Sequence, residues 1–301
     1  MSTLSPAFKD RIIAVHGKVG RKWLTTLPRL QTDLVQRWSL HNIQPVPDLS
    51  YNYLLFGINA DIKPVVLKIG VPHPELETEI QALQIFDGSG AVQLLDADPS
   101  LGALLLERIT PGDDLRVIEN DGEVTRIAAR VMKELWRTNS NYPIFPTAAD
   151  WCQGFQRYLN NPAENNPLPL HLVLQASKLA DDLLTSPHDQ CLLHGDMHHM
   201  NILKTEADTW IAIDPKGVIG EPAFEVGAFL FNPVPDLIHW PDLKEIQKQR
   251  LIILGEELII DRERLTVWSF VRSVLSAIWS HEDGEDWSYG IKVAEVLRDL
   301  I

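Results

Sequence analysis

Residues 191–217 read CLLHGDMHHMNILKTEADTWIAIDPKG, and this stretch decides how the rest of the chain is interpreted. Short apolar runs at its start and near its end flank a segment that is too polar to form part of a core. Each run leads into an acidic residue, Asp196 after His-Gly and Asp214 before Pro-Lys-Gly. Asn201 lies five residues after the first acid and thirteen before the second. The pattern predicts two short strands that carry a loop with three oxygen-bearing side chains.

These three side chains suit one type of chemistry. Mg²⁺ prefers carboxylate and other oxygen ligands together with phosphate oxygens and water, and Asp214 and the amide oxygen of Asn201 fit that role. Asp196 suits the acceptance of a proton from a substrate hydroxyl. Phosphoryl transfer from Mg-ATP needs this combination, because the protein mainly positions groups and stabilises charge. The alternative is a hairpin loop in which Asp and Asn only cap turns, but the spacing of the whole set favours phosphoryl transfer.

The stretch resembles the catalytic loop H-G-D-L-H-x-G-N of the aminoglycoside phosphotransferases, a branch of the kinase-like fold. The whole chain resembles, more specifically, the streptomycin 6-kinase and hydroxyurea phosphotransferase family. Met200 departs from the pattern, because many relatives have Gly there, and His199 is an additional histidine. Further segments that carry the resemblance are residues 20–24, 65–70, 105–112, 213–217 and 220–226.

The resemblance implies an α+β protein with the two-lobed protein-kinase-like fold. A small N-terminal lobe with an antiparallel sheet and a helical extension would cover residues 1–110 and bind the nucleotide. A larger, mostly helical lobe would cover residues 111–301 and carry the catalytic loop and the acceptor site. At 301 residues the chain exceeds the usual size of one core, which agrees with two lobes. ATP and Mg²⁺ are the implied cofactors, with Asp196 as the catalytic base and Asn201 and Asp214 as metal ligands.

Lys68 lies inside the apolar run 64–70, where alternation predicts a strand with Val66 and Lys68 on one face. A buried lysine needs a partner, whereas a lysine on an edge strand would face water and protect against aggregation. The helix predicted at 74–86 offers Glu79, which lies three, four and seven residues before apolar positions of the inward stripe. Kinases bind ATP phosphates with a strand lysine that a helix glutamate holds, so we expect Lys68 and Glu79 in the nucleotide site.

Two other parts of the first lobe are candidates for nucleotide contacts. Residues 103–109 predict a strand that leads into Thr-Pro-Gly, a break suited to a hinge. By the resemblance, the backbone of Glu107 and Ile109 would bind adenine; a buried strand with an exit loop explains the sequence equally well. No G-x-G-x-x-G motif is present, and the equivalent stretch begins at Ser50. Ser50 or backbone N–H groups are expected to serve there instead.

Aminoglycosides carry ammonium and guanidinium groups, and carboxylates bind a guanidinium through two hydrogen bonds. Glu221 and Glu225 are therefore candidate acceptor-binding residues, together with Asp283 in the acidic run 282–286. Relatives usually have Asp at the position of Glu225, and a structural role for it is equally open. The acidic run is alternatively a solvated loop between two helices. Aromatic side chains that suit stacking on a sugar or a guanidinium are Trp151, Trp240, Trp279 and Trp287.

The composition, with 45% hydrophobic and 23% charged residues, is that of a soluble globular protein. A formal net charge of −14 argues against nucleic-acid binding and favours a cationic small-molecule partner, although acidity also serves solubility alone. No apolar run is long enough for a signal peptide or a membrane helix, so we expect no membrane association. Cys152 and Cys191 form no C-x-x-C pattern, which predicts reduced thiols in the cytoplasm. We expect a monomer or a weak homodimer.

Apolar periodicity predicts the helices. Residues 5–41 are expected to form two helices, broken near Gly17 and at Pro28. Further helices are expected at about residues 124–135, 148–159, 170–184, 242–257, 262–279 and 286–300.

The histidines of the catalytic stretch lack a further ligand at metal spacing, and Mg²⁺ prefers oxygen, so we interpret them as packing and hydrogen-bonding residues.

Two classes of function agree with these patterns. The first is an ATP-dependent kinase that phosphorylates a hydroxyl of a streptomycin-like aminoglycoside, with hydroxyurea or an unknown metabolite as alternative acceptors. The second is a catalytically silent nucleotide-binding protein. All the positions that phosphoryl transfer requires are filled, which favours the enzyme.

Overall fold

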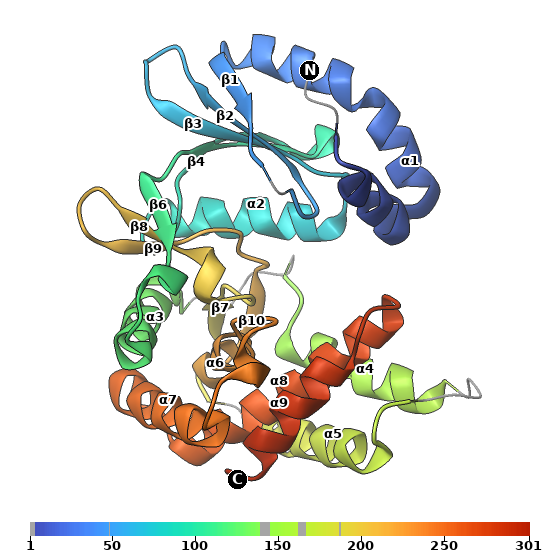
Figure 1. The fold of residues 1–301 in the computed structure, drawn as a ribbon, viewed down its shortest axis with the longest axis vertical. Coiled ribbons are helices and arrows are strands. Elements are labelled where there is room, and N and C mark those ends of the chain that lie inside the picture. The colour runs from blue at the N-terminus through green and yellow to red at the C-terminus, as the bar shows by residue number, and fades with distance from the viewer. Residues whose placement is uncertain (1–3, 48, 139–144, 162–166, 187) are drawn as a thin grey trace. The chain divides into compact units, whose positions relative to one another are not determined.

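The computed structural model describes residues 4–47, 49–138, 145–161, 167–186 and 188–301. The chain divides into two compact units, Met1–Gly112 and Asp113–Ile301 (Figure 1). The division falls inside β6 (Pro111–Asp114), two residues after the boundary expected from the sequence. Part of the Pro- and Asn-rich segment that precedes residue 169 lies outside the described residues.

The first unit is built on a five-stranded sheet of order β1-β2-β3-β5-β4, in which every neighbouring pair is antiparallel. Its strands are β1 (His41–Pro45), β2 (Tyr53–Ile58), β3 (Pro64–Ile69), β4 (Leu94–Asp98) and β5 (Ala103–Glu107), with η1 (Pro99–Leu101) between the last two. Asn59 forms the turn between β2 and β3, because its side-chain oxygen accepts hydrogen bonds from the N–H groups of Asp61 and Lys63. β3 is the central strand, so the edge-strand interpretation of Lys68 is wrong.

Helix α1 (Pro6–Arg37) covers one face of this sheet. The helix kinks at Gly17, whose φ of 54° is left-handed and suits glycine, as the sequence predicts. The break expected at Pro28 is wrong, because α1 continues through it. Pro28 is exposed, and buried leucines on both sides of it hold the helix on the sheet, so packing overrides local preference. The shared core contains Phe8, Ile12, Trp23, Leu27 and Leu34 of α1 with Leu55, Val65, Leu67 and Ile69 of the sheet.

His73 caps the N-terminus of helix α2 (Pro74–Phe86), because its ring accepts a hydrogen bond from the N–H of Glu75. Val65, Leu67 and Ile69 of β3 belong to the core beneath α1, and alternation places Lys68 on the opposite face. Lys68 there meets Glu79 of α2, so the two helices cover opposite faces of the sheet.

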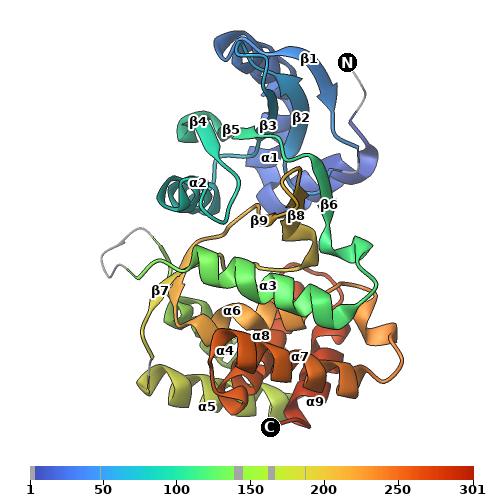
Figure 2. The same cartoon turned by 90° about the vertical axis from the view of Figure 1, so that its left-hand side faces the viewer.

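The second unit is mostly helical and is organised around α8 (Arg262–Glu282), which packs against five other helices (Figure 2). Those helices are α4 (Ala148–Asn160), α5 (Leu170–Thr185), α6 (Pro222–Leu230), α7 (Leu243–Leu258) and α9 (Ser288–Arg298). α3 (Asp121–Leu135) packs against α7, and the short helices are η2 (Leu115–Val117), η3 (His199–Asn201) and η4 (Leu237–His239). The predicted helices are confirmed within a few residues at their ends.

Two short antiparallel pairs frame the stretch from which the sequence analysis began. β7 (Cys191–Leu193) pairs with β10 (Val218–Gly220), and β8 (Ile202–Thr205) pairs with β9 (Trp210–Ala212). The first pair brackets the whole stretch and the second pair lies inside it. The loop that carries Asp196 and Asn201 is therefore anchored at both ends.

The sequence analysis did not predict β1, β6, β8, β10 or α6. Every residue of α6 from Ala223 to Leu230 is buried, including Glu225. A helix that is buried on all sides has no polar face, so it shows no helical periodicity. β1 is an exposed edge strand that ends in proline, and β10 is three residues long, so neither has a clear alternating pattern. Within the described part of the chain, none of the helices combines the length and apolar character needed to span a membrane.

Gly227 is expected to be required for the packing of α6 on α8. A Cβ added there would lie 2.6 Å from both Cβ and Cγ of Arg272, so Gly227→Ala should force the helices apart and lower the free energy of unfolding by about 1–3 kcal/mol. Gly122→Ala on α3 is the matched control, because its new methyl would lie 3.3 Å from the nearest atom. Urea unfolding of both variants measures the difference, and equal stabilities would show that the α6–α8 approach tolerates a side chain.

Candidate active site

The imidazole of His194 connects the two acidic ends of the catalytic stretch. The side chain is fully buried; its Nε2–H donates to the carbonyl of Ile213 (2.8 Å), and its Nδ1 accepts from the N–H of Asp196 (3.1 Å). Burial lowers the pKa of His194 to about 4, so the ring is neutral and keeps one donor and one acceptor. Its backbone carbonyl accepts from the N–H groups of Lys216 and Gly217. One residue thus holds the backbone beside Asp196 and beside Asp214.

Glu225 holds the same loop from α6. Its carboxylate accepts hydrogen bonds from the backbone N–H groups of His194 (2.7 Å) and Gly195 (2.9 Å), and its side chain is buried. Burial raises the pKa of Glu225 to about 7, and the two N–H donors oppose this rise. Of the two roles that the sequence left open for Glu225, the geometry corresponds to the structural one.

Asp196 and Asn201 lie at the two ends of the loop. The carboxylate of Asp196 is 38% exposed, and Nε2 of His198 lies 3.9 Å from its Oδ2. The side-chain nitrogen of Asn201 donates to the carbonyl of Asp196 (3.0 Å), and the carbonyl of Asn201 accepts from the N–H of Ile213 (2.9 Å). Asn201 therefore links the backbone of Asp196 to the residue before Asp214. Asp196 combines a fixed backbone with a carboxylate that solvent reaches, which suits a proton acceptor.

The donor chemistry around Asn201 and Asp214 fits a magnesium ion. With its nitrogen committed to the carbonyl of Asp196, the amide of Asn201 offers its oxygen as a ligand. Asp214, with a left-handed φ of 59°, adds a half-buried carboxylate directly after the shared backbone link. An amide oxygen and a carboxylate are hard ligands of the kind that Mg²⁺ takes. Among the described residues there is no cluster of three His, Cys, Asp or Glu side chains suited to a metal.

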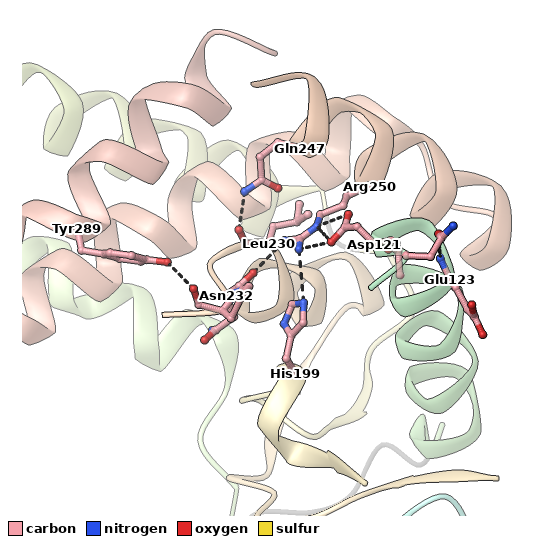
Figure 3. A network of polar contacts seen from close by, with 11 residues as sticks. Asp121, Glu123, His199, Leu230, Asn232, Gln247, Arg250 and Tyr289 are labelled. Carbon is pink, nitrogen blue, oxygen red and sulfur yellow. Dashed lines mark hydrogen bonds and ion pairs between the residues drawn. The ribbon is translucent and has the colours of Figure 1, made fainter. Parts of the chain in front are cut away.

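His199 belongs to a buried network around Arg250 of α7 (Figure 3). Arg250 is fully buried and forms an ion pair with Asp121 at the start of α3, in which its Nε lies 2.9 Å from Oδ2 and its Nη2 lies 2.5 Å from Oδ1. Its Nη1 donates to the carbonyl of Asn232 (2.9 Å), and its Nη2 lies 3.4 Å from Nε2 of His199. The ring of His199 stacks on Phe229 at 4.6 Å. The network joins α3, α6 and α7 to the catalytic loop.

The protonation state of His199 follows from this network. Arginine only donates, so Nε2 of His199 must accept and the ring proton lies on Nδ1. Burial, reinforced by the charge of Arg250, lowers the pKa of His199 to about 2. Both His194 and His199 are therefore neutral structural residues, which confirms the packing interpretation of these histidines.

In the first unit, the predicted pairing of Lys68 with Glu79 is confirmed. Nζ of Lys68 lies 2.6 Å from Oε1 of Glu79, and the two side chains are 3% and 10% exposed. Lys68 lies between Leu54 of β2 and Leu104 of β5 in the register of the sheet. A buried, paired ammonium group on a central strand is held in one position, which a phosphate ligand requires.

The other nucleotide candidates have these positions in the first unit. Ser50 is exposed, in a bend before β2, and its backbone carbonyl accepts a hydrogen bond from Arg11 (3.2 Å). Glu107 ends β5, and its carboxylate accepts from the N–H of Gln93 (2.8 Å). Ile109 is half-buried in the segment that follows. The adenine and phosphate-loop contacts of these residues stay predictions.

Two of the three predicted acceptor-binding carboxylates are engaged inside the second unit. Glu221 is 4% exposed, accepts from the indole N–H of Trp268, and forms an ion pair with Arg264 (2.8 Å). Glu225 holds the loop as described above. Asp283 is exposed at the end of α8. The stacking candidates also have internal partners: Trp240 lies over the guanidinium of Arg250, and Trp151 and Trp279 lie over that of Arg272.

The sequence analysis missed Arg250 and Arg272. Arg272 lies in a largely apolar part of α8, a position that favours a neutral side chain, and Arg250 follows the polar residues 247–249 of α7 and precedes an apolar run. A charged residue on a buried helical stripe was therefore the available signal, but its partners lie far away in the sequence.

Comparisons with known proteins agree with this geometry. Residues 37–284 match the family described as aminoglycoside/hydroxyurea antibiotic resistance kinase. A streptomycin 6-kinase of Streptomyces glaucescens is 28% identical over 271 residues, which cover 89% of this chain and 87% of that protein. A hydroxyurea phosphotransferase of Kitasatospora aureofaciens is 30% identical over 276 residues, which cover 89% of this chain and 77% of that protein.

Solved structures show the fold. The choline kinase LicA of Streptococcus pneumoniae has a TM-score of 0.63 at 14% identity, and the alignment covers 90% of this chain and 98% of that one. The aminoglycoside phosphotransferase APH(4)-Ia has a TM-score of 0.61 at 13% identity, covering 91% and 99%. The predicted two-lobed kinase-like fold is confirmed.

Acid is expected to destabilise the folded chain through its buried histidines. His194 and His199 have folded pKa values of about 4 and about 2 against 6.5 for the free side chain, so the unfolded state binds more protons below pH 6.5 and stability falls. Glu225 acts oppositely between pH 7 and 4.5, because its folded pKa is raised. Two histidines against one glutamate leave a net loss on the order of 1.4 kcal/mol per pH unit between pH 6 and 5.

Urea unfolding at pH 7, 6 and 5 measures this slope. His199→Phe preserves the stacking on Phe229 and removes one titrating group, so its slope should be smaller by about 1.4 kcal/mol per pH unit. Parallel curves for this variant and the unmodified chain would show that His199 does not titrate as its burial implies.

The Arg250–Asp121 pair should respond asymmetrically to mutation. Asp121→Ala leaves a fully buried guanidinium without its carboxylate and should cost about 3–5 kcal/mol of stability. Arg250→Met should cost less, because the side chain of Asp121 is 29% exposed and water can solvate it. Lys244→Met, which breaks an exposed pair with Asp299, is the control and should cost less than about 1 kcal/mol. Equal losses for the first two variants in urea unfolding would contradict this asymmetry.

Proposed function

The chain belongs to the aminoglycoside/hydroxyurea antibiotic resistance kinase family, and from this premise we propose that it transfers the γ-phosphoryl group of ATP to a hydroxyl group of a cationic, streptomycin-like aminoglycoside. The observation that supports this most directly is the loop of the second unit. Its buried His194 binds the backbone on both sides of the segment that carries Asp196, Asn201 and Asp214. A fixed base next to a fixed pair of oxygen ligands is what phosphoryl transfer demands of a protein.

Asp196 is the proposed catalytic base. As the acceptor oxygen forms its bond to phosphorus and the bond to the ADP oxygen breaks, the hydroxyl proton passes to the carboxylate of Asp196. The exposed part of that carboxylate leaves room for an acceptor, and the hydrogen bonds of the loop backbone limit its motion. Such positioning is the main contribution that a protein can make to a loose transition state.

Asn201 and Asp214 are the proposed magnesium ligands, through one amide oxygen and one carboxylate. A bound Mg²⁺ would neutralise charge on the phosphates. The chain's own part is to keep the two ligands in register, which it does through the Ile213–Asn201 backbone hydrogen bond and the β8–β9 pairing.

In the first unit we assign phosphate binding to Lys68, with Glu79 as the residue that holds it. The buried ion pair supports this assignment, because a lysine on a central strand is otherwise costly. Adenine binding by the backbone of Glu107 and Ile109, and a phosphate-loop contact at Ser50, complete the proposed nucleotide site.

The acceptor is proposed to be a cation. The net charge of −14 supports this, and the exposed Asp283 remains the candidate contact among the three carboxylates singled out in the sequence. We assign Glu221 and Glu225 to internal support of the second unit instead, because both are buried and engaged. Hydroxyurea or an unknown metabolite is the alternative acceptor, and a catalytically silent nucleotide-binding protein is the alternative in another class.

Asp196→Asn is expected to lower acceptor-dependent ADP release by roughly 10²- to 10⁴-fold while the variant still binds ATP, because the proton acceptor is lost and the nucleotide contacts remain. The test measures ADP release with three acceptors: a streptomycin-like aminoglycoside, a neutral alcohol that is not an aminoglycoside, and hydroxyurea. Calorimetry measures ATP binding. Asp208→Asn is the control, because Asp208 lies on the exposed turn between β8 and β9 and should not affect turnover. Wild-type protein that binds ATP and turns over none of these acceptors would favour the silent alternative.

A further inference from the structure

The guanidinium of Arg272 lies in an aromatic cage inside the second unit. The residue belongs to α8 and is 5% exposed. Its Cζ lies 4.8 Å from the ring centroid of Phe224, 4.9 Å from that of Trp151 and 5.4 Å from that of Trp279. These rings come from α6, α4 and α8, so three helices enclose one positive charge. Cation–π attraction is strongest when the cation is desolvated, as it is here.

Arg272 makes few hydrogen bonds for a buried arginine. Its Nη2 donates to the carbonyl of Gly195 (3.1 Å), whereas Nε and Nη1 have no hydrogen-bond partner among the described residues. Burial lowers the pKa of Arg272, and the nearby carboxylates of Asp196 and Glu225 oppose this. An apolar residue of similar size would fill the cage without the cost of desolvating a charge. The hydrogen bond to the carbonyl of Gly195 is therefore the contact that a charged side chain provides here and an apolar side chain could not.

The accepting carbonyl belongs to the peptide group that immediately precedes Asp196. The other end of that peptide group is the N–H of Asp196, which donates to Nδ1 of His194. Arg272 therefore fixes the oxygen and His194 fixes the nitrogen of a single peptide plane. The peptide before it is held as well, because the N–H of Gly195 donates to Glu225. The backbone that aims the Asp196 side chain is thus restrained by α6 and α8 together.

The sequence around this contact is restricted accordingly. Gly195 has a φ of 85°, and a Cβ there would lie 3.1 Å from Cη2 of Trp151 and from Cγ1 of Val218. Gly227 of α6 lies directly against the stem of Arg272. Glycine is therefore required on both sides of Arg272, at the loop and at the neighbouring helix.

We propose that Arg272 is a positioning residue for phosphoryl transfer, which holds the Gly195–Asp196 peptide group in the orientation that the base requires. This role rests on the proposed function of Asp196. The cage is at the same time occupied by the chain's own guanidinium, so Trp151 and Trp279 do not bind a guanidinium of the acceptor there. A purely structural Arg272 would affect stability alone, whereas a positioning residue affects turnover in a protein that remains folded.

Arg272→Met tests the proposal, because methionine fills the cage and donates no hydrogen bond. We expect kcat to fall at least tenfold, KM for ATP to stay within twofold, and hydrogen exchange at the N–H of Asp196 to accelerate at least tenfold. Arg264→Met is the matched control on the same helix, since it removes a buried ion pair with Glu221, and the other hydrogen bonds of Arg264 go to the carbonyls of Leu183 and Ser186. The control should leave kcat and the exchange of Asp196 unchanged.

Arg272→Ala adds a rescue experiment. Soluble methylguanidinium should enter the emptied cage and restore part of kcat in a saturable manner, and Arg264→Ala should show no such rescue. The proposal is overturned if Arg272→Met retains kcat within twofold and the exchange of Asp196 matches that of the wild type. If none of the acceptors tested supports ADP release by the wild type, the proposed function fails. The exchange measurement alone then decides whether Arg272 holds the peptide group.

Discussion

The second unit depends on the neutral imidazole of His194. Its two ring nitrogens do different things, one donating to the carbonyl of Ile213 and the other accepting from the N–H of Asp196. A protonated ring would have no acceptor and would lose the second bond. Complete burial keeps the ring neutral, so the apolar packing around it decides the geometry of the loop. No other residue type supplies one donor and one acceptor across a rigid ring at this spacing.

Three buried charged residues of the second unit surround that loop. Glu225, Arg250 and Arg272 are all buried, and all three contact the segment from His194 to His199. Buried ions are poor sources of stability compared with well-packed apolar side chains. They do fix the orientation of the loop groups that they contact, because each makes hydrogen bonds that an apolar side chain cannot make. The helical unit thus holds a short irregular loop from several sides, where regular secondary structure offers no support.

A contact could be predicted from the sequence when its two residues lie close together along the chain. The loop was predictable from the spacing of its residues and from the family resemblance. The Lys68–Glu79 pair was predictable because periodicity places each residue on a known face and the resemblance to kinases pairs them. The partners of Glu221 and Glu225 were not predictable, since a carboxylate in a sequence does not reveal that Arg264 or two backbone N–H groups already bind it. α6 was missed because a helix buried on all sides has no polar face. Contacts between helices far apart in the chain carry no local signal.

The contacts of the tryptophans limit how the proposed cationic acceptor could be bound. Three of the four tryptophans that suit cation stacking lie over guanidinium groups that the chain itself provides, at Arg250 and Arg272. An aromatic cage filled by an internal cation cannot also discriminate between acceptors. Under the proposal of a cationic acceptor, these three rings are already engaged, so its recognition would fall to solvent-accessible carboxylates, whose attraction is long-range and weakened by salt. Charge attraction of this kind would favour a cationic aminoglycoside over neutral hydroxyurea, the two acceptors that the description of the family names.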